Sequence, residues 1–410
     1  MSSNIKEIAG GITAVQGFKA SGIHIGIKSR NPDKKDVAII AAENICQVAG
    51  CYTKNKYAAA PVTWCREITK KGQARAIVIN SGNANACTGN QGLSDVREMA
   101  CLTADCLQAE TEQILVCSTG VIGVTLPMDK VEAGIKAAAQ ALSDNGGRHA
   151  AQAIMTTDTF PKEIAISVQI GDHTINLGGM AKGSGMIHPD MATMLAFITT
   201  DALISAEALQ AALSQSVIKS FNMVTVDGDT STNDTVLVMA NGLAANPRIE
   251  KDSPLFKPFC EALDYVCLFL AKMLAKDGEG ATKLLRVIVK NGSSWQEAAK
   301  AAKAVVSSSL VKAAFFGEDA NWGRIICALG YSGAQFDPGQ VDIVLKSAAG
   351  QEPVMKKGSG LNFDEDKAAR ILAADEIDIL VDLHDGTAEA TAWGCDLSYK
   401  YVEINGCYRT

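Results

Sequence analysis

Apolar runs and polar, glycine-rich segments alternate along the chain. Short apolar runs bounded by Gly, Asn or Asp are typical of buried strands, and we predict strands at residues 37–40, 76–79, 114–116, 194–199, 222–226, 236–239 and 284–289. Apolar residues spaced three and four apart indicate amphipathic helices, which we predict at residues 93–107, 129–142, 205–220, 254–276 and 294–314. An alternating stretch at 163–170, a Gly171-Asp172 turn and residues 174–177 predict a hairpin.

The two ends of the chain are dominated by strand patterns. We predict strands and turns for the first 65 residues, and mostly strands for the last 70, at residues 341–345, 377–383, 387–392 and 398–404. The Asp385-Gly386 step is expected to join two of these strands as a hairpin. Because strands and helices do not alternate regularly, we predict an α+β (mixed α/β) fold with helices packed on β-sheets, not a Rossmann fold.

Composition narrows the classes of protein. The chain has 410 residues, more than one ordinary domain, with 47% hydrophobic and 20% charged residues, as in globular proteins with a sizeable core. A net charge of -7 without a basic stripe argues against nucleic-acid binding. No apolar run approaches a membrane span and the N-terminus lacks the pattern of a signal peptide, so we expect no membrane partner and a cytoplasmic protein.

Twelve cysteines raise the question of disulfides or metal. They include no CxxC pair and no histidine at zinc-finger spacing. We therefore expect reduced, mostly buried thiols and no metal site, with a cysteine-rich metal or redox protein as an alternative.

The stretch GMAKGSGMIHPDMATMLAFITTDA, residues 179–202, combines a glycine-rich loop with an apolar strand. A threonine hydroxyl is a weak nucleophile without a base, but the α-amine of an N-terminal threonine, with a pKa of about 7.7–8.0, supplies one. Gly183 and Gly185 allow the strained turn that attack on the preceding carbonyl requires. We therefore hypothesise self-cleavage between Ala192 and Thr193, with Thr193 as nucleophile. The alternative is an ordinary turn before a buried strand.

Other polar motifs carry weaker predictions. DGDTSTNDT, residues 227–235, has three carboxylates but lacks the closing glutamate of an EF-hand, which favours a polar active-site or structural turn over a calcium site. His188 is a candidate general base, although a histidine in a His-Pro turn more often makes a structural hydrogen bond. No complete dinucleotide fingerprint and no phosphate-loop motif is present.

The stretch KGSGMIHPDMATMLAFITTDA resembles the self-cleavage region of the ornithine acetyltransferases, the ArgJ family of arginine biosynthesis. Further matching segments follow in order along the whole chain: GGITAVQGFKASG, NSGNANACTG, CSTGVIG, TTDTFPK, VDGDTSTNDT, DGEGATK, GEDANWGRI and YVEINGCYRT. So many ordered segments make the resemblance specific.

The resemblance implies a DmpA-like fold and cleavage into an α chain, residues 1–192, and a β chain, residues 193–410, which assemble as an α2β2 heterotetramer. It also implies a ping-pong reaction in which N-acetylornithine acetylates Thr193 and glutamate then takes the acetyl group. No cofactor is implied, although acetyl-CoA is a second candidate acetyl donor. A DmpA-type N-terminal-nucleophile aminopeptidase is the alternative.

Carried over by position, the family's site residues fall on this chain as follows. Thr193 is the nucleophile and also contacts substrate, and Thr119 and Gly120 form the oxyanion hole. The implied substrate-binding residues are Thr156 or Thr157, Lys182, Glu279, Asn405 and Thr410. Lys182, Asn405 and Thr410 suit an α-carboxylate, and Glu279 suits an amine. The sequence departs from the family at Gly406-Cys407, where Ala-Asp is expected, and at Asp190, where asparagine is expected.

Overall fold

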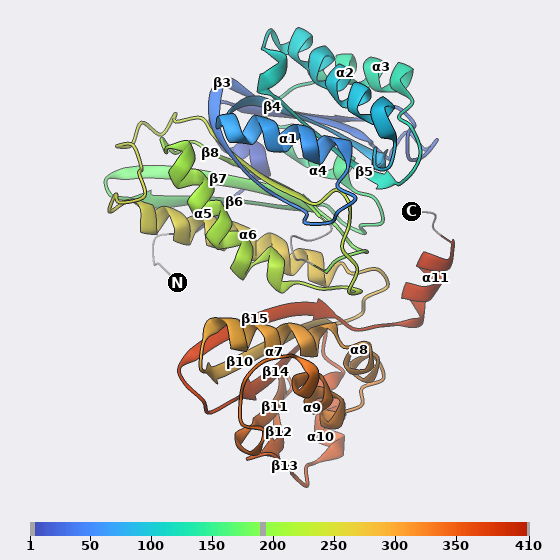
Figure 1. Cartoon of the computed structure of the whole chain (residues 1–410), viewed down its shortest axis with the longest axis vertical. Helices are drawn as coiled ribbons and strands as arrows, with labels where there is room; N and C mark the ends of the chain where they lie inside the picture. The colour runs from blue at the N-terminus through green and yellow to red at the C-terminus, as the bar shows by residue number, and fades with distance from the viewer. Residues whose placement is uncertain (1–4, 189–193, 408–410) are drawn as a thin grey trace.

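The computed structural model describes residues 5–188 and 194–407, which fold into two sheets with helices packed on them (Figure 1). In the described residues the larger sheet has nine strands, ordered β1-β6-β7-β8-β9-β3-β4-β5 with β2 beside β3. Its strands are β1 (Ile5–Ile8), β2 (Phe18–Ile23), β3 (Val37–Tyr52), β4 (Gln73–Asn83), β5 (Ile114–Val121), β6 (Lys162–Ile170), β7 (His173–Lys182), β8 (Leu195–Thr200) and β9 (Thr235–Ala240). The mixed α/β prediction is confirmed.

The larger sheet folds over on itself at β3. The first part of β3 pairs with β4, the last part pairs with β9, and the register shifts between Ala41 and Cys46. Apolar side chains from the two halves meet in one core, including Ile40 and Ile79 on one side and Phe197 and Leu237 on the other. The result is a pair of facing β layers.

Helices cover both outer faces of these β layers (Figure 1). One set packs on β3–β5 and the other on β6–β9. The helices of this part are α1 (Ala60–Lys71), α2 (Gly89–Leu107), α3 (Met128–Gln140), α4 (Gly147–Ile154), α5 (Ala206–Lys219) and α6 (Phe256–Lys276), with short 3-10 turns η1 (Gly11–Ala14), η2 (Thr111–Gln113) and η3 (Phe221–Met223).

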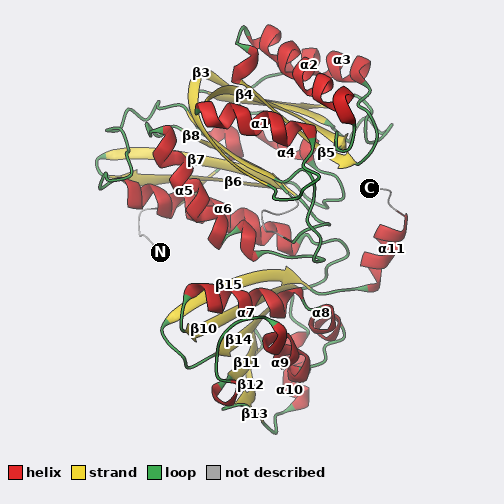
Figure 2. Ribbon diagram, in the orientation of Figure 1, coloured by secondary structure: helices red, strands yellow, loops and turns green. Residues whose placement is uncertain are grey.

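The second sheet has six strands in the described chain, ordered β13-β12-β11-β14-β10-β15 (Figure 2). They are β10 (Leu284–Gly292), β11 (Asp342–Ser347), β12 (Gly350–Lys356), β13 (Ser359–Gly360), β14 (Glu376–Asp382) and β15 (Ala388–Cys395). Its helices are α7 (Trp295–Ser307), α8 (Ser309–Phe316), α9 (Trp322–Tyr331), α10 (Glu365–Leu372) and α11 (Tyr399–Cys407), with the 3-10 turn η4 (Pro338–Gln340).

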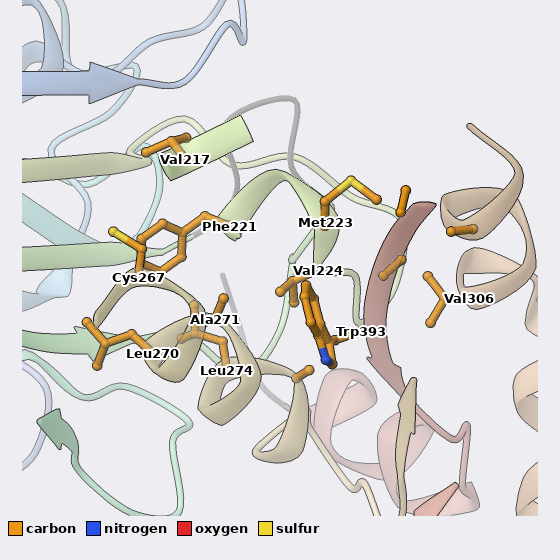
Figure 3. Close-up of a cluster of buried hydrophobic side chains, with 14 of the residues drawn as sticks. Val217, Phe221, Met223, Val224, Cys267, Leu270, Ala271, Leu274, Val306 and Trp393 are labelled. Carbon is orange, nitrogen blue, oxygen red and sulfur yellow. The ribbon is translucent and has the colours of Figure 1, made fainter. Parts of the chain in front are cut away.

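One hydrophobic core joins the two sheets. Figure 3 shows Trp393 of β15 between side chains of α6 and η3 on one side and Val306 of α7 on the other. Leu270 and Leu274 of α6 are fully buried here. The smaller sheet is therefore packed onto the α6 face of the larger one. None of the helices in the described residues has the length and apolar character needed to cross a bilayer.

Most predicted elements are confirmed, and their ends follow local chemistry. Ser205 caps α5 by accepting a hydrogen bond from the Ala208 amide, and Ser294 caps α7 in the same way. The predicted helix at 294–314 is two helices, because Ser308 interrupts it and caps α8. The helix α1 was missed, as were α9, α10 and β12.

Two strand predictions and one hairpin prediction are wrong. Residues 222–226 form η3 and a single bridge from Val224 to Trp393, because this segment packs across the end of β15. The predicted strand at 398–404 is wrong because residues 399–404 lie in the exposed helix α11, since the chain has already left the sheet at Asp396. The Asp385-Gly386 step does not close a hairpin, because β10 lies between β14 and β15.

Candidate active site

A polar cavity of about 240 Å³ lies where the large sheet meets the segments before β10 and after β15. It is lined by seven of the residues predicted for the site, namely Thr119, Gly120, Thr156, Thr157, Lys182, Glu279 and Asn405. Residues separated by almost 300 positions are thus brought to one place. Ala192, Thr193 and Thr410 lie outside the described residues, as does Asp190. The roles assigned to all of these residues stay predictions.

Thr119 and Gly120 lie near the end of β5. The strand continues through the CSTGV motif, beside the parallel strand β4, instead of ending in a loop before it. Gly120 has φ of 133°, and a Cβ there would lie 2.3 Å from the Gly82 carbonyl carbon. Only glycine fits this position, because a side chain would clash with the neighbouring backbone. The close approach places the Thr119-Gly120 step at the cavity wall.

Lys182 ends β7 and is buried, with 5% of its surface exposed. Its Nζ donates to the Thr119 hydroxyl at 3.0 Å and to the Thr156 hydroxyl at 3.2 Å. Burial lowers the pKa of Lys182, and the nearby Asp158 carboxylate opposes that shift. Among the described residues these hydroxyls occupy two of its three N–H donors, which leaves one for a ligand.

Glu279 reaches the cavity from the segment between α6 and β10. Its Oε2 accepts a hydrogen bond of 2.7 Å from the Asn405 amide, and its own backbone N–H donates to Ser184. A Cβ at Gly185 would lie 2.3 Å from the Glu279 carboxylate. The second glycine of the GSG motif therefore gives this carboxylate room beside the backbone.

The DGDTSTNDT loop lines the cavity and holds both sides of the segment 189–193. The Asp227 carboxylate accepts hydrogen bonds from the Met186 and Ile187 amides at 2.6 and 2.8 Å. Asp234 Oδ1 accepts one of 3.1 Å from the Met194 amide. Burial raises the pKa of both carboxyls, that of Asp234 well above its usual range. The loop is a structural and cavity-lining turn, as expected.

Two other expectations concern His188 and metal. A His188 ring nitrogen lies 3.1 Å from the Thr225 hydroxyl, and the described residues that line the cavity do not include this histidine. The structural hydrogen bond is therefore the better account of His188. All twelve cysteines are free, but only five of them are buried, so the expectation of mostly buried thiols is wrong. Across residues 5–188 and 194–407, His, Cys, Asp and Glu side chains form no group of three that would hold a metal ion.

Sequence reasoning missed Tyr401 and Met186 as cavity residues, and it named Asp227 only as part of the polar run 227–235. The Tyr401 hydroxyl lies 3.2 Å from Asp227 Oδ2. The two residues are 174 positions apart, so no local sequence pattern links them. Only the fold, which brings helix α11 beside the 227–235 loop, reveals the contact. Asp227 did stand out as the first carboxylate of a polar run.

The cavity combines one cation, carboxylates and several hydroxyls. A buried lysine suits a carboxylate, a glutamate suits an amine, and a small polar cavity suits a ligand with both. The fold and the site thus define a mixed α/β protein with a cavity whose side chains suit a small zwitterionic molecule of the amino-acid class.

Comparisons with known proteins identify the family. The sequence model described as the ArgJ family matches residues 19–410. The chain is 58% identical over 403 residues to the arginine biosynthesis bifunctional protein ArgJ of Symbiobacterium thermophilum, covering 98% of this chain and 99% of that protein. It is 53% identical over 401 residues to the protein of the same name from Caldanaerobacter subterraneus subsp. tengcongensis, covering 98% and 99%. The chain therefore belongs to the ArgJ family.

A solved structure agrees with this assignment. The crystal structure of arginine biosynthesis bifunctional protein ArgJ from Bacillus halodurans is similar, with a TM-score of 0.50 and 48% sequence identity. The match covers 53% of this chain and 100% of the solved chain.

Proposed function

We propose that this chain transfers the acetyl group of N2-acetylornithine to glutamate through an acetyl ester on Thr193, after cleaving itself between Ala192 and Thr193. Membership of the ArgJ family favours this acetyltransferase activity, in arginine biosynthesis, over the aminopeptidase and metal-protein alternatives. The observation that carries the proposal is the convergence of Thr119, Gly120, Lys182 and Glu279 on one amino-acid-sized cavity.

In the first half-reaction, the Thr193 hydroxyl attacks the acetyl carbonyl of N2-acetylornithine and its own α-amine takes the proton. The negative charge on the tetrahedral oxygen is stabilised at Thr119 and Gly120. Thr119 Oγ1 accepts a hydrogen bond from Lys182, so its own proton is free to point at that oxygen. The C–N bond then breaks, and ornithine leaves with the proton on its amine.

In the second half-reaction, the amine of glutamate attacks the acetyl ester on Thr193. The ester C–O bond breaks, the threonine hydroxyl regains its proton, and N-acetylglutamate leaves. Lys182 binds the α-carboxylate and Glu279 the amine of the amino-acid substrate, with Asn405, Thr410 and Thr156 or Thr157 completing the contacts. Two substrates that share one amino-acid framework can thus use one cavity in turn.

Two observations support the cleavage step. Ile187 and Met194, on either side of the segment that contains Ala192 and Thr193, both bind the loop that lines the cavity. The matched share of this chain in the Bacillus halodurans comparison, 53%, is also about the share that residues 193–410 would make up.

Further parts of the expectation from the family remain predictions. These are the use of acetyl-CoA as a second acetyl donor, an α2β2 assembly of the two chains, and a cytoplasmic location. The word bifunctional in the relatives' names supports a test of acetyl-CoA together with glutamate.

The test of the proposed function combines an assay with a denaturing gel. Incubation with N-acetylornithine and glutamate should yield ornithine and N-acetylglutamate in equal amounts. The gel should show two chains, and N-terminal sequencing of the larger should begin at Thr193. Thr193→Ala should abolish both the cut and the activity, while Thr174→Ala, at an exposed position beside the β6–β7 turn, should change neither. A single full-length band from active protein would contradict the mechanism.

A further inference from the structure

A buried lysine that the proposed reaction does not use lies directly behind the cavity. Lys162, the first residue of β6, has no exposed side-chain surface. Its Nζ lies 2.6 Å from Asp158 Oδ1 and 2.5 Å from Asp277 Oδ2, and both carboxylates are also buried. The Phe160 ring covers the same Nζ, at 5.0 Å from the ring centroid. A buried charge is costly unless it is paired, so removing one member of this ion triad would leave the others without full compensation.

Each carboxylate of the triad also holds a segment of the cavity wall. Asp158 accepts hydrogen bonds from the backbone of Thr156 at 3.0 Å and of Gly183 at 2.7 Å. Gly183 follows Lys182 in the sequence, and the Thr156 hydroxyl accepts a hydrogen bond from Lys182 Nζ. The Asp158 arm therefore sets the position of the cavity cation and of one of its hydroxyl partners.

The Asp277 arm leads to Glu279. The Asp277 carboxylate accepts from the Thr159 amide at 3.0 Å, and its carbonyl accepts from the Ser184 hydroxyl at 2.5 Å. The carbonyl of Ser184 in turn accepts from the Glu279 amide at 2.8 Å. Lys162 is thus the point at which the segments carrying Thr156, Lys182 and Glu279 are tied together.

We propose that Lys162 is a positioning residue that sets the relative placement of Lys182 and Glu279 through Asp158 and Asp277. Within the part of the chain that the structure describes, its Nζ bonds to Asp158 and Asp277, which do not line the cavity, so it acts through those two carboxylates. Lys162 and Asp158 precede the predicted cut and Asp277 follows it, so the triad also ties one predicted product to the other. The inference deepens the proposed function, on which its kinetic test rests.

Asp158 and Lys162 affect the pKa of Lys182 in opposite directions, so their effects can be measured separately. Burial would raise the pKa of Asp158, but Lys162 and Lys182 together bring it down to about 2. Asp158 raises the pKa of Lys182, whereas Lys162 lowers it. The charged groups that face Lys182 come from five segments: Asp158, Lys162, Asp234, Glu279 and Lys28.

Two variants are therefore expected to move the titration of Lys182 in opposite directions. Asp158→Asn removes its main negative neighbour, so the alkaline loss of substrate binding should shift to lower pH. Lys162→Met combined with Asp277→Asn removes one buried charge of each sign. It also removes a positive neighbour of Lys182, so the alkaline loss of substrate binding should shift to higher pH. Both variants should lower kcat/KM about 10- to 100-fold, because the wall segments are no longer tied in place.

The experiment measures pH profiles of kcat/KM for N-acetylornithine and glutamate, with a denaturing gel to confirm the cut. The Lys182 ammonium is also titrated by NMR on lysine-labelled protein, and its signal is assigned by its loss in Lys182→Arg. This titration does not depend on the reaction. Asp95→Asn replaces a buried acid of α2 and serves as the control, with wild-type profiles expected.

Shifts in opposite directions support the inference. Folded variants whose Lys182 titration is unmoved, or moves the same way in both, overturn it, as does wild-type kcat/KM in both. If the double variant does not fold, Asp158→Asn decides by the presence or absence of its downward shift. An inactive wild-type protein with opposite NMR shifts would reject the proposed function and leave the role of Lys162 standing.

Discussion

The two sheets differ in where they keep their buried polar groups. In the larger sheet a set of these groups lies at the cavity end, including Asn80, Ser118 and Lys182, while others such as Asp201 lie at the opposite end of β8. The smaller sheet has an apolar interior, and its buried Lys283, Asp396 and Ser398 lie where its chain leaves toward the cavity. One sheet thus builds most of the site, and the other presents two segments to it.

The strand order explains how the smaller sheet does this. Strands β10 and β15 are antiparallel neighbours, with Leu284 opposite Cys395, so the chain enters β10 and leaves β15 at the same place. Asp396 accepts hydrogen bonds from the Thr282 and Lys283 amides, which keeps the two segments together. Glu279 on one segment and Asn405 on the other therefore meet at 2.7 Å. Variants in each sheet can test how much that sheet contributes to the site.

The largest effect is expected in the larger sheet, at Lys182. Lys182→Met removes the buried cation and leaves the Thr119 and Thr156 hydroxyls without their shared donor. Charged hydrogen bonds contribute about 1.5–3 kcal/mol each, so kcat/KM for both substrates should fall about 100-fold. Steady-state kinetics measure this, with Lys19→Met on the half-exposed surface of β2 as the control. A loss below about threefold would remove Lys182 from substrate binding.

A smaller effect is expected at Glu279, which the smaller sheet presents. Glu279→Gln keeps the shape but removes the charge, so KM should rise about 30-fold with little change in kcat, because about 2 kcal/mol of charged hydrogen bonding is lost. Titration of the velocity against each substrate measures KM. His384→Ala, on the half-exposed surface of the same sheet, should behave like wild type. An unchanged KM for Glu279→Gln would mean that the smaller sheet contributes no binding group here.

An indirect effect is expected at Asp396, which is not among the residues that line the cavity. Asp396→Asn weakens the tie between the ends of β10 and β15, so KM should rise about tenfold, for a loss of about 1.4 kcal/mol. The effect should be smaller in the background of Glu279→Gln, because both changes act through the same carboxylate. Strictly additive effects of the two variants would contradict this coupling.

The smallest effect at neutral pH is a difference in acid stability. The folded-state pKa of Asp158 is lowered from 3.8 to about 2, so its contribution to stability is fully present above about pH 4 and is lost as the pH falls through 2. The melting temperature of the wild-type protein should therefore decline more steeply between pH 4 and 2 than that of Asp158→Asn. Calorimetry at intervals over this range compares the two slopes, and equal slopes would refute the lowered pKa.

Much of the local structure follows from the sequence alone. Helix starts at Ser205 and Ser294 and the apolar strands in both sheets depend on short-range patterns, and the structure confirms them. Helix α11 was mistaken for a strand because its Tyr399 and Tyr401 alternate with polar residues as in a strand. No neighbouring strand pairs with them, and Tyr399 is largely exposed.

The sequence by itself determined the binary pattern, the caps and the family motifs, since each depends on residues a few positions apart. The tertiary structure alone decided which motifs meet. Gly120 fits against Gly82 because β4 and β5 are parallel neighbours, and Glu279 meets Asn405 because β10 and β15 pair. The Lys162 triad shows the same limit, since Asp158 lies four residues away but Asp277 lies 115 away. Contacts of that range depend on strand order, which no local pattern encodes.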